Sequence, residues 1–224
     1  MKVSQKVRPK LRSLISSLGL IVTAALAALS TDDAFAGDIA SGRAKVAVCA
    51  PCHGADGVSK FPEIPHLAAQ NETYLIGALV AFRRAGLGQY RPERRGSRYD
   101  AVMNHQATGM TDADIGNLAA YFSSLACPVP ESAKGRGMPK LAQRCISCHG
   151  VGGRNGTSTV PRLAAQRPRY LENQLRAFRD ASAGSGATGE RRERFHPMMS
   201  RQAETLTDDD IRRLADYFAA QSCR

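Results

Sequence analysis

One short motif occurs twice in the chain: Cys-x-x-Cys-His stands at residues 49–53 and again at residues 145–149. Residues i and i+3 lie on the same face of a helical turn, so the two thiols of each motif can bond to neighbouring groups of one ligand. This spacing is the attachment signature of c-type haem, in which the following His ligates the iron. We therefore predict two covalently bound haem c groups. The predicted attachment residues are Cys49, Cys52, Cys145 and Cys148, and the predicted iron ligands are His53 and His149.

Three other uses of paired cysteines compete with haem attachment. A zinc site needs two Cys pairs separated by about 15 to 20 residues, whereas about 90 residues separate these pairs, and zinc leaves the two His unexplained. A thioredoxin-like redox pair needs a surrounding βαβ pattern, which residues 49–52 lack. A disulfide framework is disfavoured because six Cys are few for a chain of 224 residues.

A haem iron held by one His either has a sixth ligand or an open site. Met103 lies 50 residues after His53, and Met199 lies 50 residues after His149. A thioether opposite imidazole favours Fe(II) and raises the reduction potential, so both Met are predicted ligands. The alternative is that they only fill the core. Three further Met are out of register, which favours ligation by the matched pair: Met110, Met138 and Met198.

The remaining His have no equivalent His in the other copy of the motif. We expect ordinary surface positions for them, with His196 as the best substitute iron ligand because it lies three residues before Met199. The residues concerned are His66, His105 and His196.

The repeat extends far beyond the motif. When the sequence is shifted by 96 residues, 32 of the 79 positions from Cys49 to Cys127 are identical without any gap. A match of this length indicates a duplicated domain and not a short solenoid repeat. We therefore divide the chain into a leader at 1–36, a first domain at 37–127, a Pro-rich linker at 128–134 and a second domain at 135–224.

The elements that must position these residues are helices. Thr111 and Thr207 precede acidic residues and then apolar residues at i, i+3, i+4 and i+7, which predicts an amphipathic helix near each domain's end. A second helix is predicted from about residue 72 to 85, with a matching one in the repeat, and a shorter one over 42–50. Residues 86–96 and 182–192 are predicted loops. No alternating pattern predicts a strand.

The first 36 residues have the features of a signal peptide. A basic start is followed by an apolar run of about 16 residues, which is too short to span a bilayer, and by Ala34-Phe35-Ala36. We therefore expect export and cleavage. The leader carries a net charge of +3 out of +11, so the mature chain keeps +8. For an exported protein such basicity indicates an acidic protein partner or an anionic membrane face, and not nucleic acid.

The blocks Cys-x-x-Cys-His-Gly, Pro-x-Leu-Ala-x-Gln, Tyr-Leu and Leu-Ala-x-Tyr-Phe occur in the same order in both domains. In this the mature chain resembles the dihaem cytochrome c4 family. The resemblance implies an all-α fold with two tandem cytochrome c-like domains, each wrapped around a covalent haem with His/Met iron. It also implies that the carbonyls of Pro65 and Pro161 accept the Nδ1 proton of the haem His, which fixes the ring.

The resemblance further implies a periplasmic carrier that moves electrons from a respiratory donor to a terminal oxidase or another acceptor. Two alternatives remain open: a haem-bearing subunit of a dehydrogenase complex, and, less favoured, a dihaem peroxidase or thiosulfate dehydrogenase-like enzyme. The expected partners are redox proteins with acidic docking surfaces. Three Arg pairs in register could bind haem propionates or be plain surface residues: Arg83 and Arg179, Arg95 and Arg191, and Arg98 and Arg194.

The sequence departs from the family pattern at three kinds of position, one of which is Met110 in place of the Leu found at 206. Ala69 and Ala165 stand where the family often has Gly. Cys127 and Cys223 occupy equivalent positions at the domain ends, and they could pair with each other, stay free or bridge to another chain. A Cα separation above about 7 Å would exclude the mutual pair.

Overall fold

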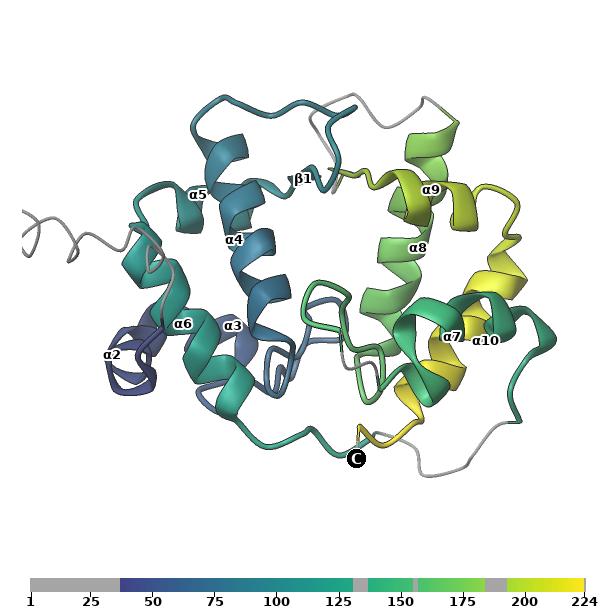
Figure 1. Cartoon of the computed structure of the whole chain (residues 1–224), viewed down its shortest axis with the longest axis horizontal. Coiled ribbons are helices and arrows are strands. Elements are labelled where there is room, and N and C mark those ends of the chain that lie inside the picture. Colours follow the sequence, from purple (N-terminus) through teal and green to yellow (C-terminus); the bar gives the residue numbers. More distant parts are fainter. Residues whose placement is uncertain (1–36, 131–136, 155–156, 184–192, 224) are drawn as a thin grey trace, which may run out of the picture. The chain divides into compact units, whose positions relative to one another are not determined.

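The computed structural model describes residues 37–130, 137–154, 157–183 and 193–223 (Figure 1). The predicted leader at 1–36, most of the predicted linker and most of the predicted loop at 182–192 lie outside the described residues. Among the described residues, no helix is long and apolar enough to cross a membrane.

The N-terminal half is built from helices and one short strand. In chain order these are α2 (Ile39–Lys45), η1 (Val46–Val48), α3 (Ala50–His53), α4 (Glu72–Gly86), β1 (Arg98–Tyr99), α5 (Ala101–Thr108) and α6 (Asp112–Ser124). Helix α6 packs against α2 and α4, and α5 packs against α4. The hydrophobic core of this half includes Leu75, Leu118 and Phe122, which are all buried.

The C-terminal half repeats this order. Its elements are η2 (Lys140–Ala142), α7 (Gln143–His149), η3 (Val151–Gly153), α8 (Pro168–Ser182), β2 (Glu193–Arg194), α9 (Pro197–Ala203) and α10 (Asp208–Ala219). Helix α8 packs against α9 and α10, as α4 does against α5 and α6. Leu171, Leu214 and Phe218 lie in its core at the positions equivalent to Leu75, Leu118 and Phe122. The predicted all-α class with two tandem domains is confirmed.

The last helix of each half begins where the sequence predicts. Thr111 accepts a hydrogen bond from the backbone of Asp114, and the Asp114 side chain accepts one from the Thr111 backbone. Thr207 and Asp210 form the same reciprocal capping box in α10. Each box satisfies backbone donors that a helix N-terminus otherwise leaves unpaired. Local sequence therefore fixes where α6 and α10 start.

The structure corrects two expectations. The predicted helix over residues 42–50 is wrong, because the chain forms α2 up to Lys45, a 3-10 turn, and then α3. The absence of strands is also wrong, because β1 and β2 pair antiparallel. Each strand has two residues, which is too short for an alternating pattern to be visible in the sequence.

Residues 96 positions apart meet one another where the two halves join. Arg98 of β1 lies opposite Arg194 of β2, and Cys127 is disulfide-bonded to Cys223 with a Cα separation of 6.1 Å. A residue can contact its own equivalent only near a two-fold axis. The two halves are therefore related by an approximate two-fold rotation.

Two glutamines extend the same symmetry. The Gln70 side chain donates to Arg162 O at 3.0 Å and accepts from Arg162 N at 2.7 Å. The Gln166 side chain donates to His66 O at 3.0 Å and accepts from His66 N at 2.8 Å. Each half thus binds the same backbone segment of the other half.

Candidate haem-binding sites

The two motif histidines lie at the ends of equivalent helices. His53 is the last residue of α3 and His149 the last residue of α7, and both are buried. Gly54 and Gly150 follow them with φ of 78° and 73°. At Gly54 a Cβ would come within 2.5 Å of Val58 O, so the sharp turn after His53 needs glycine. This turn ends the helix directly after the ligand candidate.

A proline carbonyl lies at hydrogen-bond distance from each of these imidazoles. His53 Nδ1 is 3.0 Å from Pro65 O, and His149 Nδ1 is 2.9 Å from Pro161 O. An Nδ1–H that donates to the carbonyl leaves Nε2 as the ring nitrogen with a lone pair for a metal. Burial lowers the pKa of both imidazoles, although the carbonyl opposes this, so the neutral form that a metal requires is favoured.

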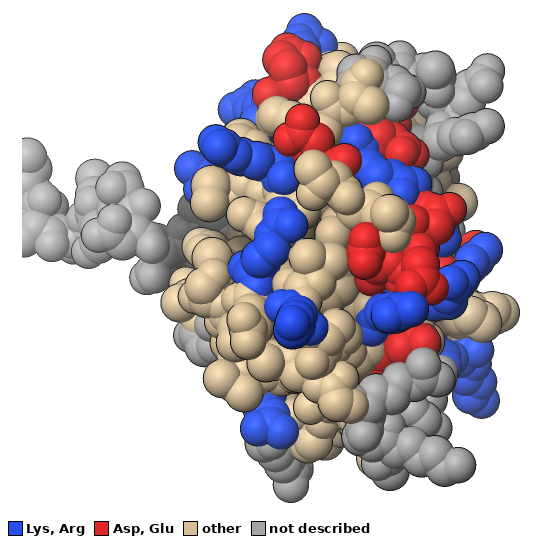
Figure 2. Space-filling view, turned by 90° about the vertical axis from the view of Figure 1, so that its right-hand side faces the viewer, with Lys and Arg blue, Asp and Glu red and all other residues tan. Residues whose placement is uncertain are grey.

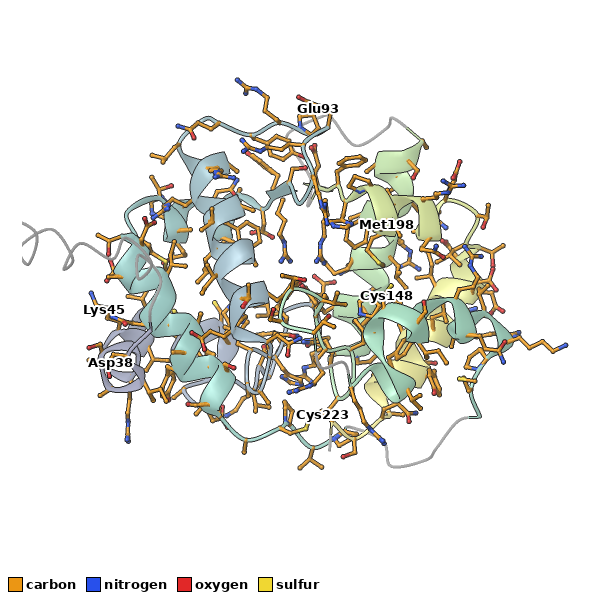
Figure 3. The ribbon with its side chains drawn as sticks, in the orientation of Figure 1. Asp38, Lys45, Glu93, Cys148, Met198 and Cys223 are labelled. Carbon is orange, nitrogen blue, oxygen red and sulfur yellow. A yellow bond between two sulfur atoms is a disulfide. The ribbon has the colours of Figure 1, made fainter. Side chains whose placement is uncertain are left out.

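The four motif cysteines form no disulfide. Cys49 and Cys145 are half-buried, and burial raises the pKa of both thiols, whereas Cys52 and Cys148 are exposed. Cys148 is labelled on α7 in Figure 3. Each half therefore presents one inner and one outer thiol next to a buried imidazole, which fits attachment at the edge of a partly exposed porphyrin.

The two predicted Met ligands hold equivalent places. Met103 is the third residue of α5 and Met199 the third residue of α9, and both are half-buried. The residue just before each of them, Val102 or Met198, is exposed. No helix was predicted at either position, because these two helices are short and lack a regular apolar pattern. Ligation of iron by Met103 and Met199 remains a prediction.

Arg98 and Arg194 come together between α4 and α8, where sequence reasoning gave no reason to expect a cluster. Arg98 donates to the hydroxyls of Tyr74 and Tyr170 at 3.2 and 3.1 Å. Arg194 donates to Tyr74 Oη at 2.9 Å and to Gln174 Oε1 at 2.6 Å. Burial alone would raise the pKa of Tyr74. The positive charges of Arg194 and Arg98 outweigh burial, and together they lower this pKa to about 7.

This cluster fits an anionic group. Two like charges stand side by side, and no carboxylate is among the partners just described, so a carboxylate from a ligand would be favoured there. The other Arg candidates are placed differently. Arg83 contacts Asp112 at 2.6 Å, and Arg179 contacts Asp208 at 2.9 Å, and each Asp is the first residue of the last helix of its half. Arg95 is exposed, and Arg191 lies outside the described residues.

The expectation of a surface position is wrong for His66. It is buried, its Nδ1 accepts from Ser59 N at 3.0 Å, and its backbone binds Gln166 of the other half. The sequence could not show this, because the burial depends on the contact between the halves. His105 is exposed and His196 half-buried.

The donor set suits haem better than a bare ion. Within the described part of the chain, no group of three or more His, Cys, Asp or Glu side chains is arranged to hold a metal ion. A porphyrin supplies four nitrogen ligands itself, so one His and one further ligand from the protein are enough. The arrangement of Cys, Cys, His and Pro is the same in both halves.

A family model described as Cytochrome c matches residues 39–126 and 135–222. The chain belongs to the cytochrome c family. Its two matched segments are two cytochrome c domains, so the protein is a dihaem cytochrome with two covalently bound haem c groups.

Individual relatives of this cytochrome agree with that assignment. The chain is 32% identical over 199 residues to cytochrome c4 of Azotobacter vinelandii, covering 81% of this chain and 88% of the relative. The crystal structure of reduced recombinant cytochrome c4 from Pseudomonas stutzeri superposes with a TM-score of 0.63 at 31% identity. It covers 83% of this chain and all of that one. The predicted resemblance to cytochrome c4 is therefore confirmed.

Another relative has a different name. The thiosulfate dehydrogenase electron acceptor of Stutzerimonas stutzeri is 29% identical over 186 residues, covering 76% of this cytochrome and 77% of the relative. The similarity thus extends to a protein that is named for the enzyme from which it takes electrons.

Proposed function

We propose that this dihaem cytochrome carries single electrons between redox proteins, with both irons held by one His and one Met. The haem of the N-terminal half is attached to Cys49 and Cys52, and that of the C-terminal half to Cys145 and Cys148. The iron ligands are His53 and Met103 in the first half, and His149 and Met199 in the second. A bound haem c supplies an iron that gains and loses one electron.

The observation that carries this proposal is the twofold occurrence of a buried His whose Nδ1 lies at hydrogen-bond distance from a Pro carbonyl. The bond holds the ring in one orientation and raises the basicity of Nε2. A Met sulfur favours Fe(II) and is retained in both oxidation states of a carrier. Pro65 and Pro161 act through the His and do not touch the metal.

The paired guanidinium groups of Arg98 and Arg194 are the proposed partners of haem propionates. They lie between the halves with Tyr74, Tyr170 and Gln174 around them. Carboxylates bind guanidinium with charge-assisted hydrogen bonds, and they would separate two positive charges that otherwise repel each other.

The test is carbon monoxide binding to the reduced holoprotein. Wild type should bind none rapidly, because both sixth positions are filled by sulfur. Met103→Ala and Met199→Ala should each open one iron and bind about one equivalent. Met138→Ala, at an exposed position out of register, is the control and should behave as wild type. Rapid binding by wild type would show a vacant or labile site and would favour an enzyme.

We propose that this cytochrome acts in the periplasm and docks acidic partners, because it carries a predicted signal peptide and an excess of Lys and Arg. Figure 2 shows the side formed by the C-terminal half, where Lys and Arg are spread widely and Asp and Glu gather in patches. Attraction to an acidic partner weakens as salt rises. The rate of electron transfer to such a partner should therefore fall between 20 and about 200 mM salt.

A second candidate is an electron-accepting subunit or partner of a dehydrogenase. The similarity to the thiosulfate dehydrogenase electron acceptor favours it. Reduction of the oxidised cytochrome by thiosulfate alone, compared with thiosulfate plus a thiosulfate dehydrogenase, separates the possibilities. Reduction only with the enzyme supports the acceptor role, whereas reduction by thiosulfate alone indicates that the cytochrome itself oxidises thiosulfate.

A further inference from the structure

The disulfide that joins the two halves has different surroundings at its two sulfur atoms. Cys127 Sγ lies 3.3 Å from the carbonyl oxygen of Pro128. Cys223 instead lines a cavity of about 10 Å³ between the halves, which has room for about one water molecule. Arg162 lines the same cavity and therefore lies close to Cys223. One sulfur of the bond is thus next to a carbonyl oxygen, and the other is near a cation.

The charge of Arg162 has no carboxylate partner within the described part of the chain. One terminal nitrogen of its guanidinium donates to Ala69 O, and its buried Nε has no hydrogen-bond partner among the described residues. Burial lowers the pKa of this group, and no carboxylate opposes the effect. Its backbone is fixed by two hydrogen bonds to the Gln70 side chain. A thiolate at Cys223 would supply the missing anion.

The two cysteines would therefore behave differently once the bond opened. A thiol at Cys127 can donate its proton to the Pro128 carbonyl, which favours the protonated form. Positive charges favour the thiolate at Cys223, because Arg162 borders its cavity and Arg154 Nε donates at 2.7 Å to the carbonyl of the residue just before it. A cysteine that is stable as a thiolate leaves faster in disulfide exchange. Cys223 is thus the better leaving group.

Cys127 lies where a thiol of another molecule can reach it. Residues 126–130 form neither helix nor strand, and Val129 in this segment is 86% exposed. Both cysteines are only half-buried, and Figure 3 shows Cys223 at the edge of the molecule. Exchange requires that the attacking thiolate reach one sulfur directly. The segment that carries Cys127 allows this without rearrangement of a helix.

We propose that the Cys127–Cys223 bond is a site of thiol–disulfide exchange, and that its partner is a protein that carries two reactive thiols. One thiolate of that protein attacks Cys127 Sγ, the Cys127–Cys223 bond breaks, and Cys223 leaves as a thiolate beside Arg162. The partner's second thiol then attacks the mixed disulfide and releases Cys127. The partner's dithiol is oxidised to a disulfide, and the two cysteines gain two electrons and two protons.

Exchange at this site acts on the contact between the halves and not on the irons. Cys127 ends the N-terminal half, and Cys223 lies at the end of the C-terminal half. Reduction therefore leaves the linker as the covalent connection between them. The redox state of the bond then determines how firmly the halves hold each other through the paired glutamine contacts. This role is independent of the proposed iron ligation.

The test is the reaction of the wild-type holoprotein with glutathione, stopped with iodoacetamide and mapped by peptide mass spectrometry. The haems are kept ferrous with ascorbate, so that iron does not consume the thiol. The haem-attaching cysteines are thioethers in the holoprotein and do not react. Glutathione should be found on Cys127 and the alkyl group on Cys223. Glutathione on Cys223 would overturn the proposal, and so would a failure of glutathione to open the bond in the folded protein.

The contribution of Arg162 is measured by the rate of this reaction in variants. Arg162→Gln removes the charge and keeps N–H donors, and it should slow reduction about three- to tenfold because Cys223 becomes a poorer leaving group. Arg162→Lys keeps the charge and should restore most of the rate. Arg43→Gln makes the same change at an exposed position of α2 and should react as wild type. Equal rates for the two Gln variants would contradict the assigned role of Arg162.

A second measurement separates charge from access. Alkylation of the single free thiol in Cys127→Ser and in Cys223→Ser is followed against pH, because the midpoint reports thiolate formation whatever the access to the sulfur. The Cys223 thiol should ionise at lower pH than the Cys127 thiol. Adding Arg162→Gln should raise the midpoint of Cys223 and leave that of Cys127 unchanged. Equal midpoints in the two single-cysteine proteins would show that neither sulfur is the preferred leaving group.

Discussion

Two alanines, one in each half, adopt a backbone conformation that usually belongs to glycine. Ala69 has φ 56° and Ala165 has φ 53°. They stand at equivalent positions in the Pro-x-Leu-Ala-x-Gln blocks, and Ala69 N donates to Phe122 O at 2.9 Å. A left-handed conformation costs an L-residue with a Cβ about 1–2 kcal/mol. The repeated turn is therefore retained against a local cost in both halves.

Replacing either alanine should stabilise the protein. Ala69→Gly and Ala165→Gly relieve the left-handed strain, while the more flexible unfolded chain offsets part of the gain, so each should raise the free energy of unfolding by up to about 1 kcal/mol. Denaturant unfolding of the holoprotein measures it. Ala55→Gly, in a loop where φ is not positive, should instead destabilise. A loss of stability in both turn variants would contradict the strain argument.

His66 is a single-residue difference between the halves, because Arg162 occupies its place in the repeat. Burial lowers the pKa of His66 to about 4, and the neutral ring accepts the hydrogen bond from Ser59. The unfolded chain takes up this proton near pH 6.5, whereas the folded protein resists it until about pH 4. Stability from this group is thus complete above about pH 6.5 and is lost as the pH falls toward 4.

We expect the free energy of unfolding to drop by roughly 3 kcal/mol across that pH window because of His66. His66→Asn should remove this part of the pH dependence, since the Asn oxygen can still accept from the Ser59 backbone and does not titrate. Unfolding curves between pH 7 and 4 measure it. The His105→Asn control changes an exposed residue and should keep the wild-type slope. Equal slopes for the His66 variant and wild type would rule the explanation out.

At the scale of elements, the two halves place their site residues with the same devices. Each haem His ends a helix before a glycine turn, and each Met candidate is the third residue of a short helix packed on a long one. Arg83 donates to Met110 O at 2.8 Å, and Arg179 donates to Leu206 O at 3.0 Å. These contacts tie the long helix to the turn that follows the Met helix. Each Met helix is therefore fixed to its long helix by packing along its length and by a hydrogen bond at the turn that follows it.

The capping boxes of α6 and α10 can be tested directly. Thr111→Ala and Thr207→Ala remove the hydroxyl that accepts from the third helical residue, and each should cost about 1 kcal/mol of stability. Thr111→Ser and Thr207→Ser keep the hydroxyl and should cost little. Thermal unfolding compares the four proteins. Equal losses for the Ser and Ala variants would mean that the methyl group, and not the cap, is what matters.

At the scale of the whole molecule, the approximate two-fold axis brings equivalent residues together at two places. The Arg98–Arg194 strand pair brings two positive charges together, and the Cys127–Cys223 bond links the ends of the two last helices. The cysteine pair has a sequence separation of 96, and the axis is what brings these two equivalent positions within bonding range. The disulfide joins the two halves covalently.

Removing this bond should destabilise the protein by about 2–4 kcal/mol, because the bond closes a long loop in the unfolded chain. Cys127→Ser, Cys223→Ser and the double variant should lose the same amount, since any of them removes the one bridge. Denaturant unfolding measures the loss, and thiol titration of unfolded wild type should find no free thiol. Intact stability in all three variants would show that the non-covalent interface is sufficient.

The duplication, the two attachment motifs, the candidate ligands and the capped last helices could all be predicted from the amino-acid sequence. Those features depend on local spacing and on identity at a fixed shift, both of which are visible along the chain. Tertiary structure alone decided that His66 is buried, that Cys127 pairs with Cys223, and that Arg98 and Arg194 meet. All three depend on how one half packs on the other. The residues concerned lie about 100 positions apart in the chain, and a contact between domains produces no repeating pattern in the sequence from which it could be predicted.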